Sequence, residues 1–326
     1  MVTERTQYFT LIITLLLIIS ICPHLGLNAV ILSEVGSKPK VIPPDLVIDH
    51  VKNVAFDNIT TSCITIKDSR NITIEGSYIH NSQYFGISII NSSNVLIFND
   101  TVVGNNYDGV NIQNSSNVFI QFNNISFNGH DGITVWEGSQ NITISSNVLV
   151  GNQYGIFILG SNNVSVTRNQ VINSTIYDVY LYDPAYVEVK DNVIIGGGAG
   201  VEVDYGDFIY VSDNVISHDQ VGVYLGLGIY NMSLCYNNIS FSKYFGLVIH
   251  YYPQPFLSKG NIFKSAPTIY FFQRPNSTNT VEKQSAPTII TSPHKKSVLV
   301  SPIAVAVLAT AVSLTFLSLL KRRRKG

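Results

Sequence analysis

The sequence predicts an all-β solenoid, a parallel β-helix of about nine coils, from three observations. The first is an internal repeat of 22 to 24 residues between about Arg70 and Val248. A unit this short cannot enclose a core of its own, so each unit must bury its apolar face by stacking on its neighbours. The units start at Asn71, Asn94, Asn117, Asn141, Asn163, Tyr186, Phe208 and Asn231.

The second observation is that apolar and polar residues alternate inside each unit. Ile72-Thr-Ile74, Val110-Asn-Ile112 and Val201-Glu-Val203 are examples. A period of two is typical of β-strands. Each unit has room for three short strands separated by polar corners, which is the composition of one β-helix coil. The Leu-x-x-Leu-x-Leu pattern of leucine-rich repeats, which have a similar length, is absent from the sequence.

The third observation is that the corners repeat as well. Six residues after each unit start stands a polar residue, beginning with Ser77 and Asp100. We expect these side chains to stack at about 4.8 Å per coil and to hydrogen-bond as a ladder, with Asn favoured because it tolerates a left-handed corner. The predicted ladder asparagines are Asn123, Asn147, Asn169, Asn192, Asn214 and Asn237. Glycine recurs at the third corner, for example at Gly132, where we expect a positive φ.

This corner pattern resembles the right-handed parallel β-helix (PbH1) repeats of the pectin-lyase-like superfamily. It is most similar to the NosD-like repeats, also called the carbohydrate-binding and sugar-hydrolysis type. The resemblance covers about residues 44–262 and implies a right-handed, single-stranded parallel β-helix. It implies no single activity, because many activities share this scaffold. The copper handling suggested by the NosD label finds no support in the residues, since Cys, Met and His are not clustered.

The two ends of the chain predict export and membrane anchorage. Residues 1–29 contain a short apolar run after Arg5 and predict a secretory signal peptide, with an uncleaved anchor as the alternative. Residues 298–320 form an uncharged, apolar stretch and predict a transmembrane helix, which residues 321–326 follow as a basic cytoplasmic tail. Between them we expect a β-helix domain at 41–263 and a Ser/Thr/Pro-rich stalk at 264–297. The predicted location is the cell membrane, single-pass, with the β-helix outside the cell.

Composition narrows the class of partner. Charged residues make up 13% of the chain and the net charge is −1, so no nucleic-acid partner is expected. Cys63 and Cys235 lie about seven coils apart, too far to form a disulfide within one chain. Glycosylation is a further expectation for an exported chain that contains Asn-x-Ser/Thr sequons. The candidate sites are Asn58, Asn91, Asn114, Asn124, Asn173 and Asn276.

The outward face of the third strand of each unit is the predicted ligand-binding surface. Sugars stack on aromatic rings and hydrogen-bond to carboxylates, and this face offers both kinds of group. We therefore predict binding of polysaccharide or surface glycoprotein here. The residues are Trp136, Tyr180, Tyr182, Glu202, Asp204 and Tyr224.

Two alternatives remain open. If the chain is an enzyme, Glu202 and Asp204 are the candidate catalytic acid and nucleophile of a glycoside hydrolase, or calcium ligands of a polysaccharide lyase together with Asp183 and Asp207. No Lys or Arg lies on this face to serve as the base of a lyase, so binding is favoured over catalysis and no cofactor is expected. The other alternative is a structural or adhesive envelope protein without a ligand, in which the acidic residues from Asp178 to Asp219 form a solvated patch.

Overall fold

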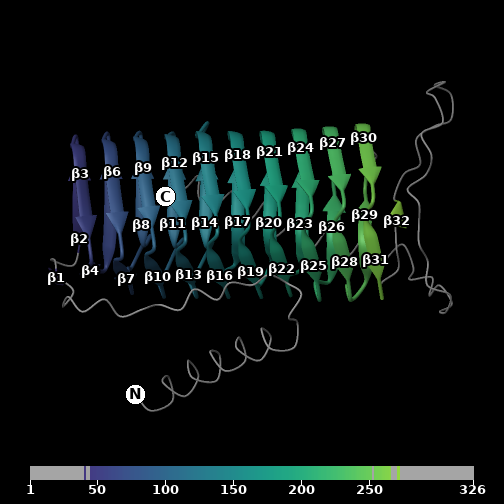
Figure 1. Cartoon of the computed structure of the whole chain (residues 1–326), viewed down its shortest axis with the longest axis horizontal. Helices are drawn as coiled ribbons and strands as arrows, with labels where there is room; N and C mark the ends of the chain where they lie inside the picture. The colour runs from purple at the N-terminus through teal and green to yellow at the C-terminus, as the bar shows by residue number, and fades with distance from the viewer. Residues whose placement is uncertain (1–39, 42–44, 252, 266–269, 272–326) are drawn as a thin grey trace, which may run out of the picture. The chain divides into compact units, whose positions relative to one another are not determined.

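Three long parallel sheets make up the structure, a computed structural model that describes residues 40–41, 45–251, 253–265 and 270–271. The strands of each sheet lie side by side along the solenoid (Figure 1). Every strand pairing is parallel, and these described residues contain no helix.

We number the sheets by the strands of the repeat unit. Sheet 1 contains β3 (Lys52–Asp57), β6 (Arg70–Glu75), β9 (Ser93–Phe98), β12 (Ser116–Gln121), β15 (Gln140–Ser145), β18 (Asn162–Thr167), β21 (Ala185–Lys190), β24 (Asp207–Ser212), β27 (Tyr230–Cys235) and β30 (Gln254–Lys259). Sheet 2 contains β1 (Lys40–Val41), β4 (Ile59–Thr61), β7 (Tyr78–His80), β10 (Thr101–Val103), β13 (Asn124–Ser126), β16 (Val148–Val150), β19 (Gln170–Ile172), β22 (Val193–Ile195), β25 (Val215–Ser217), β28 (Asn238–Ser240) and β31 (Ile262–Lys264). Sheet 3 contains β2 (Asp45–Asp49), β5 (Cys63–Lys67), β8 (Ile87–Ile90), β11 (Val110–Gln113), β14 (Ile133–Trp136), β17 (Tyr154–Leu159), β20 (Tyr177–Tyr182), β23 (Ala199–Asp204), β26 (Val221–Leu225), β29 (Phe245–Ile249) and β32 (Tyr270–Phe271).

The chain visits the three sheets in turn, so three consecutive strands make one coil of the solenoid. The strands from β2 to β31 form successive triplets of this kind, in agreement with a solenoid of about nine coils. The all-β prediction and its three-strand unit are confirmed. Strand β32 lies in the segment predicted as a stalk, and it pairs in parallel with β29 at the end of sheet 3.

Along each strand, successive side chains point alternately into the core and to the outside. In the coil that contains β8 to β10, the side chains of Ile87, Ile89, Val95, Ile97 and Val102 are fully buried. Full burial of a side chain of this size stabilises the fold by roughly 1.5–3 kcal/mol. Each coil repeats such a set, so stacked apolar side chains stabilise the solenoid. The two described cysteines are free, as expected from their separation.

A ladder of asparagines fills the corner between sheets 1 and 2. The Nδ2 of Asn169 donates to the carbonyl oxygen of Ile144 at 2.9 Å and to Oδ1 of Asn192 at 3.1 Å. Its own Oδ1 accepts from the backbone N–H of Asn147 at 2.9 Å. The same pattern occurs at each ladder asparagine named above and ends at Asn261. The left-handed residue of the corner is the one before the ladder residue, such as Arg168 with φ 56°, and not the asparagine itself.

The other two corners contain ladders that the sequence reasoning missed. Between sheets 3 and 1, backbone N–H groups donate to serine hydroxyls one coil on, along the column Ser69, Ser92, Ser115 and Ser139. Between sheets 2 and 3, amides stack along Asn105, Asn128 and Asn152. These residues recur every 23 to 24 positions, and this spacing is the sequence pattern that could have predicted both ladders.

The glycines of the third corner serve close packing. None of them has a positive φ, so the expected reason is wrong. At Gly132 an added Cβ would lie 2.5 Å from the carbonyl oxygen of Gly155 and 2.8 Å from a methyl carbon of Leu149. Glycine is required because the neighbouring coil approaches its backbone too closely for a side chain.

The predicted signal peptide (1–29), transmembrane helix (298–320), cytoplasmic tail (321–326) and the sequon at Asn276 lie outside the described residues, as does most of the predicted stalk. Within the described part of the chain, no helix is long and apolar enough to cross a membrane.

Candidate functional site

The residues predicted to bind a ligand lie together on the outer face of sheet 3. The register pairs Tyr180 with Glu202 and Tyr182 with Asp204 on β20 and β23. It also pairs Glu202 with Tyr224 on β26. Trp136 ends β14, two strands away from β20 in the sheet, and its indole N–H is buried without a hydrogen-bond partner among the described residues. Apart from Trp136, the predicted residues therefore form one contiguous group, which we call the sheet 3 site.

An aromatic cluster forms the base of this site. The rings of Phe157 and Tyr180 stack at 5.1 Å with an interplanar angle of 6°. Tyr154 and Tyr177, which begin β17 and β20, place their rings 5.7 and 5.2 Å from Tyr180. Tyr180 is consequently only 5% exposed. It is a packing residue of the site rather than the exposed stacking platform that the sequence suggested.

Glu202 is a buried acid within this cluster. Its side chain is 8% exposed and hydrogen-bonds to the hydroxyl of Tyr177. Burial raises the pKa of Glu202 well above its usual range, and the nearby Asp204 carboxylate raises it further. Burial therefore favours the protonated form of Glu202, which can donate a hydrogen bond or a proton, over the carboxylate that a nucleophile requires.

Asp204 is half-buried at the end of β23. Its Oδ1 accepts from the backbone N–H of Leu227 at 3.2 Å, and its Oδ2 accepts from the hydroxyl of Tyr180 at 3.3 Å. Burial raises the pKa of Asp204 to about 6, although both hydrogen bonds favour the ionised form. In the next coil, Gly226 leaves room for this carboxylate, because a Cβ there would lie 1.7 Å from Oδ1. Asp204 is the ionised acceptor of the site at neutral pH.

Two further residues complete the site and were not predicted to belong to it. Tyr177 contacts Glu202 as described, and the hydroxyl of Tyr224 lies 3.0 Å from Nδ1 of His250. Burial lowers the pKa of His250, which favours its neutral form. The sequence pattern that could have predicted His250 is its outward position in the third strand of the unit, the same position that Asp204 occupies two units earlier. The sequence reasoning treated it as an isolated histidine.

The sheet 3 site contains no positive charge. Among the described residues at the same outward strand position as Asp204, the one lysine is Lys67 on β5. It lies six strands from Asp204, which is about 29 Å at the β-strand spacing. Lys243 lies in the turn before β29, with its ammonium 4.9 Å from the ring centre of Tyr244. The raised pKa values of Glu202 and Asp204 follow from burial without a compensating cation.

The remaining acidic residues of this region fall into two groups. Asp183, Glu188, Asp191 and Asp213 are exposed to solvent, as the alternative of a solvated patch expects, whereas two others are not. Asp178 and Asp219 are fully buried at the corner between sheets 2 and 3. The backbone N–H of Gly197 donates to Asp178 Oδ2 at 3.0 Å and to Asp219 Oδ1 at 2.8 Å. Burial raises the pKa of both carboxyls, and a proton shared between them relieves their repulsion.

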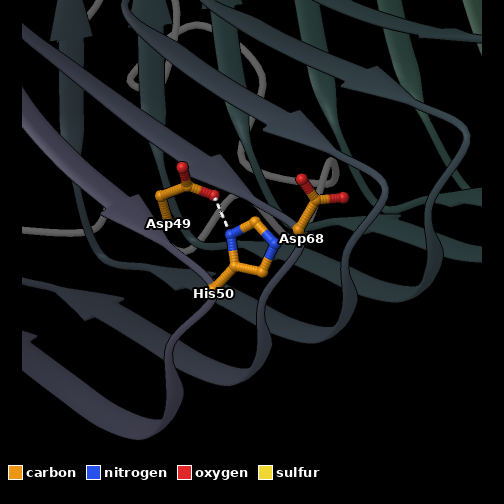
Figure 2. Close-up of side chains that lie close together, drawn as sticks. All are labelled: Asp49, His50 and Asp68. Carbon is orange, nitrogen blue, oxygen red and sulfur yellow. Dashed lines mark hydrogen bonds and ion pairs between the residues drawn. The ribbon is translucent and has the colours of Figure 1, made fainter.

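A second group of ionisable side chains lies at the N-terminal end of the solenoid. Asp49, His50 and Asp68 place their ligand atoms within 4.8 Å of one another, and Figure 2 shows the His50 ring between the two carboxylates. The Nδ1 of His50 lies 2.7 Å from Asp49 Oδ1, while the Lys67 ammonium lies 3.8 Å from Asp68 Oδ2. One imidazole and two carboxylates can hold a divalent transition metal. A metal ion here would have to compete with Lys67.

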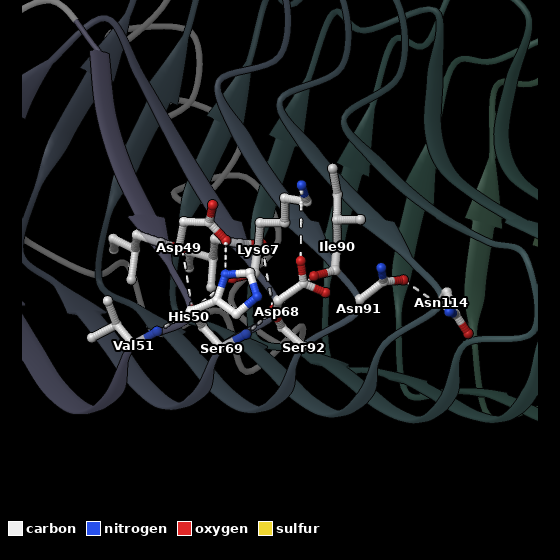
Figure 3. A network of polar contacts seen from close by, with 12 residues as sticks. Asp49, His50, Val51, Lys67, Asp68, Ser69, Ile90, Asn91, Ser92 and Asn114 are labelled. Atoms are coloured by element: carbon white, nitrogen blue, oxygen red, sulfur yellow. Dashed lines mark hydrogen bonds and ion pairs between the residues drawn. The ribbon is translucent and has the colours of Figure 1, made fainter.

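This group, which we call the N-terminal cluster, starts a row of corner side chains. Figure 3 shows Asp68, Asn91 and Asn114 following one another along the corner between sheets 3 and 1. The Nδ2 of Asn114 donates to Oδ1 of Asn91 at 2.8 Å. The other described sequon candidates are exposed as well: Asn58, Asn124 and Asn173. Among the described residues, the N-terminal cluster is the one group of three or more His, Cys, Asp or Glu whose ligand atoms lie this close together.

Comparison with known proteins agrees with the fold. The family described as "Right handed beta helix region" matches residues 49–184. The family described as "Periplasmic copper-binding protein (NosD)" matches residues 122–248 and 151–283. The fold is that of a right-handed parallel β-helix, and its repeats are similar to those of both families. No curated protein sequence matches it.

Several solved structures share this architecture at low sequence identity. The surface protein and adhesin PfbA of Streptococcus pneumoniae is 18% identical with a TM-score of 0.54, over 64% of this chain and 68% of that one. The periplasmic alginate epimerase AlgG is 14% identical with a TM-score of 0.52, over 67% and 61%. The catalytic domain of a GH87 α-1,3-glucanase is 11% identical with a TM-score of 0.50, over 77% and 64%. Likeness at this level establishes the fold alone.

Proposed function

We propose that this chain is a cell-surface β-helix protein whose sheet 3 site binds a neutral glycan. The observation that supports this most directly is the position of Asp204. With its pKa of about 6, this carboxylate is mainly ionised at neutral pH. It pairs with the half-buried Tyr182 in the strand register, and the half-buried Tyr224 pairs with Glu202 on the same strand. Aromatic rings that stack on a sugar, next to a fixed acceptor for its hydroxyl groups, are the elements of a carbohydrate site.

The electrostatics of the site favour neutral over acidic glycans. Glu202 and Asp204 already have raised pKa values because burial is not offset by a cation. A uronate bound here would bring a third carboxyl group next to Asp204, and like charges in a partly buried site repel. Alginate and pectate type polymers are therefore expected to bind poorly, even though alginate-acting proteins share the fold.

The surface location is part of the same proposal. It rests on the signal peptide and transmembrane helix expected at 1–29 and 298–320, and on the family description, which names a periplasmic protein. The domain between them presents one long solenoid face to the outside of the cell. Protease protection of the tail at 321–326 in intact cells tests the orientation, because only a cytoplasmic tail is protected.

The binding experiment compares matched variants of the full-length chain, purified in a detergent without a sugar headgroup. A polysaccharide array should show saturable binding to neutral polymers and none to alginate or polygalacturonate at pH 7. Asp204→Asn and Tyr182→Ala should each weaken this binding about tenfold or more, as loss of a central contact does. Tyr236→Ala removes an exposed ring, 54% exposed at another corner, and serves as the control. Binding that survives both site variants contradicts the proposal.

A second candidate function is glycoside hydrolysis, favoured by the buried position of Glu202 beside Asp204, which raises the pKa of Glu202. A buried acid with a raised pKa next to an ionised carboxylate is the arrangement that supplies a general acid. Glu202 could protonate a leaving group only if the aromatic cluster around it opened, since the side chain is 8% exposed. Product analysis of each polymer bound on the array tests this function. Turnover that is lost in Glu202→Gln supports hydrolysis, and unchanged polymer supports binding alone.

A further inference from the structure

A hollow lies on the outer face of sheet 1, away from the sheet 3 site. It has a volume of about 280 Å³ and lies across β18, β21 and β24. Its rim contains Asn163, Tyr186, Glu188 and Tyr210. The two tyrosines are 57% and 46% exposed, so their rings present large aromatic surfaces to solvent.

The hollow coincides with a break in a ladder of exposed asparagines. At the start of the units from Asn71 to Asn163, the side-chain amide donates to the corresponding side chain of the preceding coil, as from Nδ2 of Asn163 to Oδ1 of Asn141 at 2.7 Å. In the next two coils this column holds Tyr186 and Phe208, whose rings stack at 4.7 Å with an interplanar angle of 4°. The column is polar again at Asn231, which bonds to Asp207 at 2.7 Å. The break places two stacked aromatic rings in this part of sheet 1, where the coils before it have asparagine.

A carboxylate lies next to the aromatic rings. The strand register places Glu188 between Ser165 of the preceding coil and Tyr210 of the following one, all on the outer face. Glu188 is exposed, and neither of the ion pairs found among the described residues includes it. The rim thus combines two aromatic faces, an unpaired carboxylate and the amide of Asn163. Sugar hydroxyl groups can donate to the carboxylate and both donate to and accept from the amide.

We propose that this hollow is a second glycan-binding subsite, which takes a single ring of a neutral sugar between Tyr186 and Tyr210. Its volume lies just below the roughly 300–1,000 Å³ of ordinary small-molecule pockets, which fits one ring rather than a long oligosaccharide. The negative charge of Glu188 disfavours uronates here as well. The subsite shares no residue with the sheet 3 site and does not depend on it.

The two sites occupy neighbouring faces of the same coil. Strand β20 carries Tyr182 of the sheet 3 site, and β21, which carries Tyr186 and Glu188, follows it after a corner of two residues, Asp183 and Pro184. A branched glycan that reached both faces would bind more tightly than either site alone, because its second contact would be intramolecular.

The test uses the full-length chain and three neutral hexasaccharide probes: cellohexaose, maltohexaose and chitohexaose. Isothermal titration and saturation-transfer NMR should detect a binding event that Tyr186→Ala weakens about tenfold, as removal of a central aromatic contact does. Glu188→Gln should weaken it to a smaller extent. Tyr236→Ala is the matched control, since Tyr236 is also an exposed aromatic residue with positive φ at a corner, and it should bind as the wild type does.

The same titrations in the Asp204→Asn background separate the two proposals. Binding that persists there and is lost on adding Tyr186→Ala supports the subsite on sheet 1, whatever happens at sheet 3. Identical binding by wild type, Tyr186→Ala and Glu188→Gln in both backgrounds would overturn it, and so would the absence of binding to all three probes. Thermal melts followed by circular dichroism establish that each variant is folded.

Discussion

Asp100 takes the place of an asparagine in the ladder between sheets 1 and 2, and this substitution makes stability depend on pH. The side chain is 1% exposed. Its Oδ1 accepts from the backbone N–H of Ser77 at 2.7 Å, but its Oδ2 has no hydrogen-bond partner. In the next coil, the corresponding Nδ2 of Asn123 donates to the carbonyl oxygen of Ile97 and to Oδ1 of Asn147, both at 3.0 Å. A protonated carboxyl, or an amide, is the group that fits this position.

The size of the pH effect on stability follows from the pKa of Asp100. Burial raises the pKa of Asp100 from 3.8 to about 7. The folded chain therefore holds a proton that the unfolded chain releases, and the stabilisation is complete below about pH 4. It falls by about 1.4 kcal/mol per pH unit as the pH rises toward 7. The ionised form then costs at most about 4 kcal/mol relative to the protonated one.

Asp100→Asn removes this dependence, because its amide stays neutral and can donate along the ladder. We expect the variant to match the wild type near pH 4 and to be more stable by up to about 4 kcal/mol at pH 8, a rise in Tm of several degrees. Thermal melts of both proteins at pH 4, 6 and 8, followed by circular dichroism, measure the difference. An equal effect at all three pH values, or a loss of stability at pH 8, would refute the reasoning.

Three further predictions concern the corners and metal binding. Gly132→Ala should destabilise the fold by about 1–3 kcal/mol in chemical unfolding, because the added methyl overlaps the next coil. The control Gly138→Ala should cost about 1–2 kcal/mol, because only the left-handed backbone opposes it. Equal stability of Gly132→Ala and wild type would contradict the close-packing role. Asn169→Leu should cost about 2–5 kcal/mol, since it removes the acceptor of the buried N–H of Asn147 and the bond to the carbonyl of Ile144. A loss below 1 kcal/mol would show that the ladder contributes little. Chelation with EDTA should leave both Tm and glycan binding unchanged, because the N-terminal cluster is exposed, partly paired with Lys67 and remote from the sheet 3 site. A fall in Tm or in glycan affinity on chelation would assign a metal a structural or binding role.

The fold could be predicted from the sequence because every coil repeats the same residue pattern. Alternation of the kind seen at Ile72 and Ile74 recurs in every unit, so each strand supports the assignment of the next. The corners were harder to predict. Gly132 was expected to adopt a positive φ, but its role is to allow close approach of the neighbouring coil, and the contacts there join residues 17 and 23 positions apart.

The site was predicted in part. Strand alternation places Tyr180 and Glu202 outside the coil, and they do lie on the outer face of sheet 3. It could not reveal that Tyr154 and Tyr177, the first residues of β17 and β20, cover that face. Burial of this kind depends on side-chain packing between neighbouring coils, which the period of two does not encode. It raises the pKa of Glu202, which the sequence predicted to be an exposed carboxylate.

The most direct test of the central claim uses Trp136, which is the only tryptophan in the chain and lies on the same face of sheet 3 as Asp204. Its emission should change during titration of the full-length chain with the neutral glycan identified on the array, and saturate at the concentration at which calorimetry saturates. Asp204→Asn should shift both curves together. Glycan binding that leaves the emission of Trp136 unchanged and is unaffected by Asp204→Asn would place the ligand elsewhere and contradict the account.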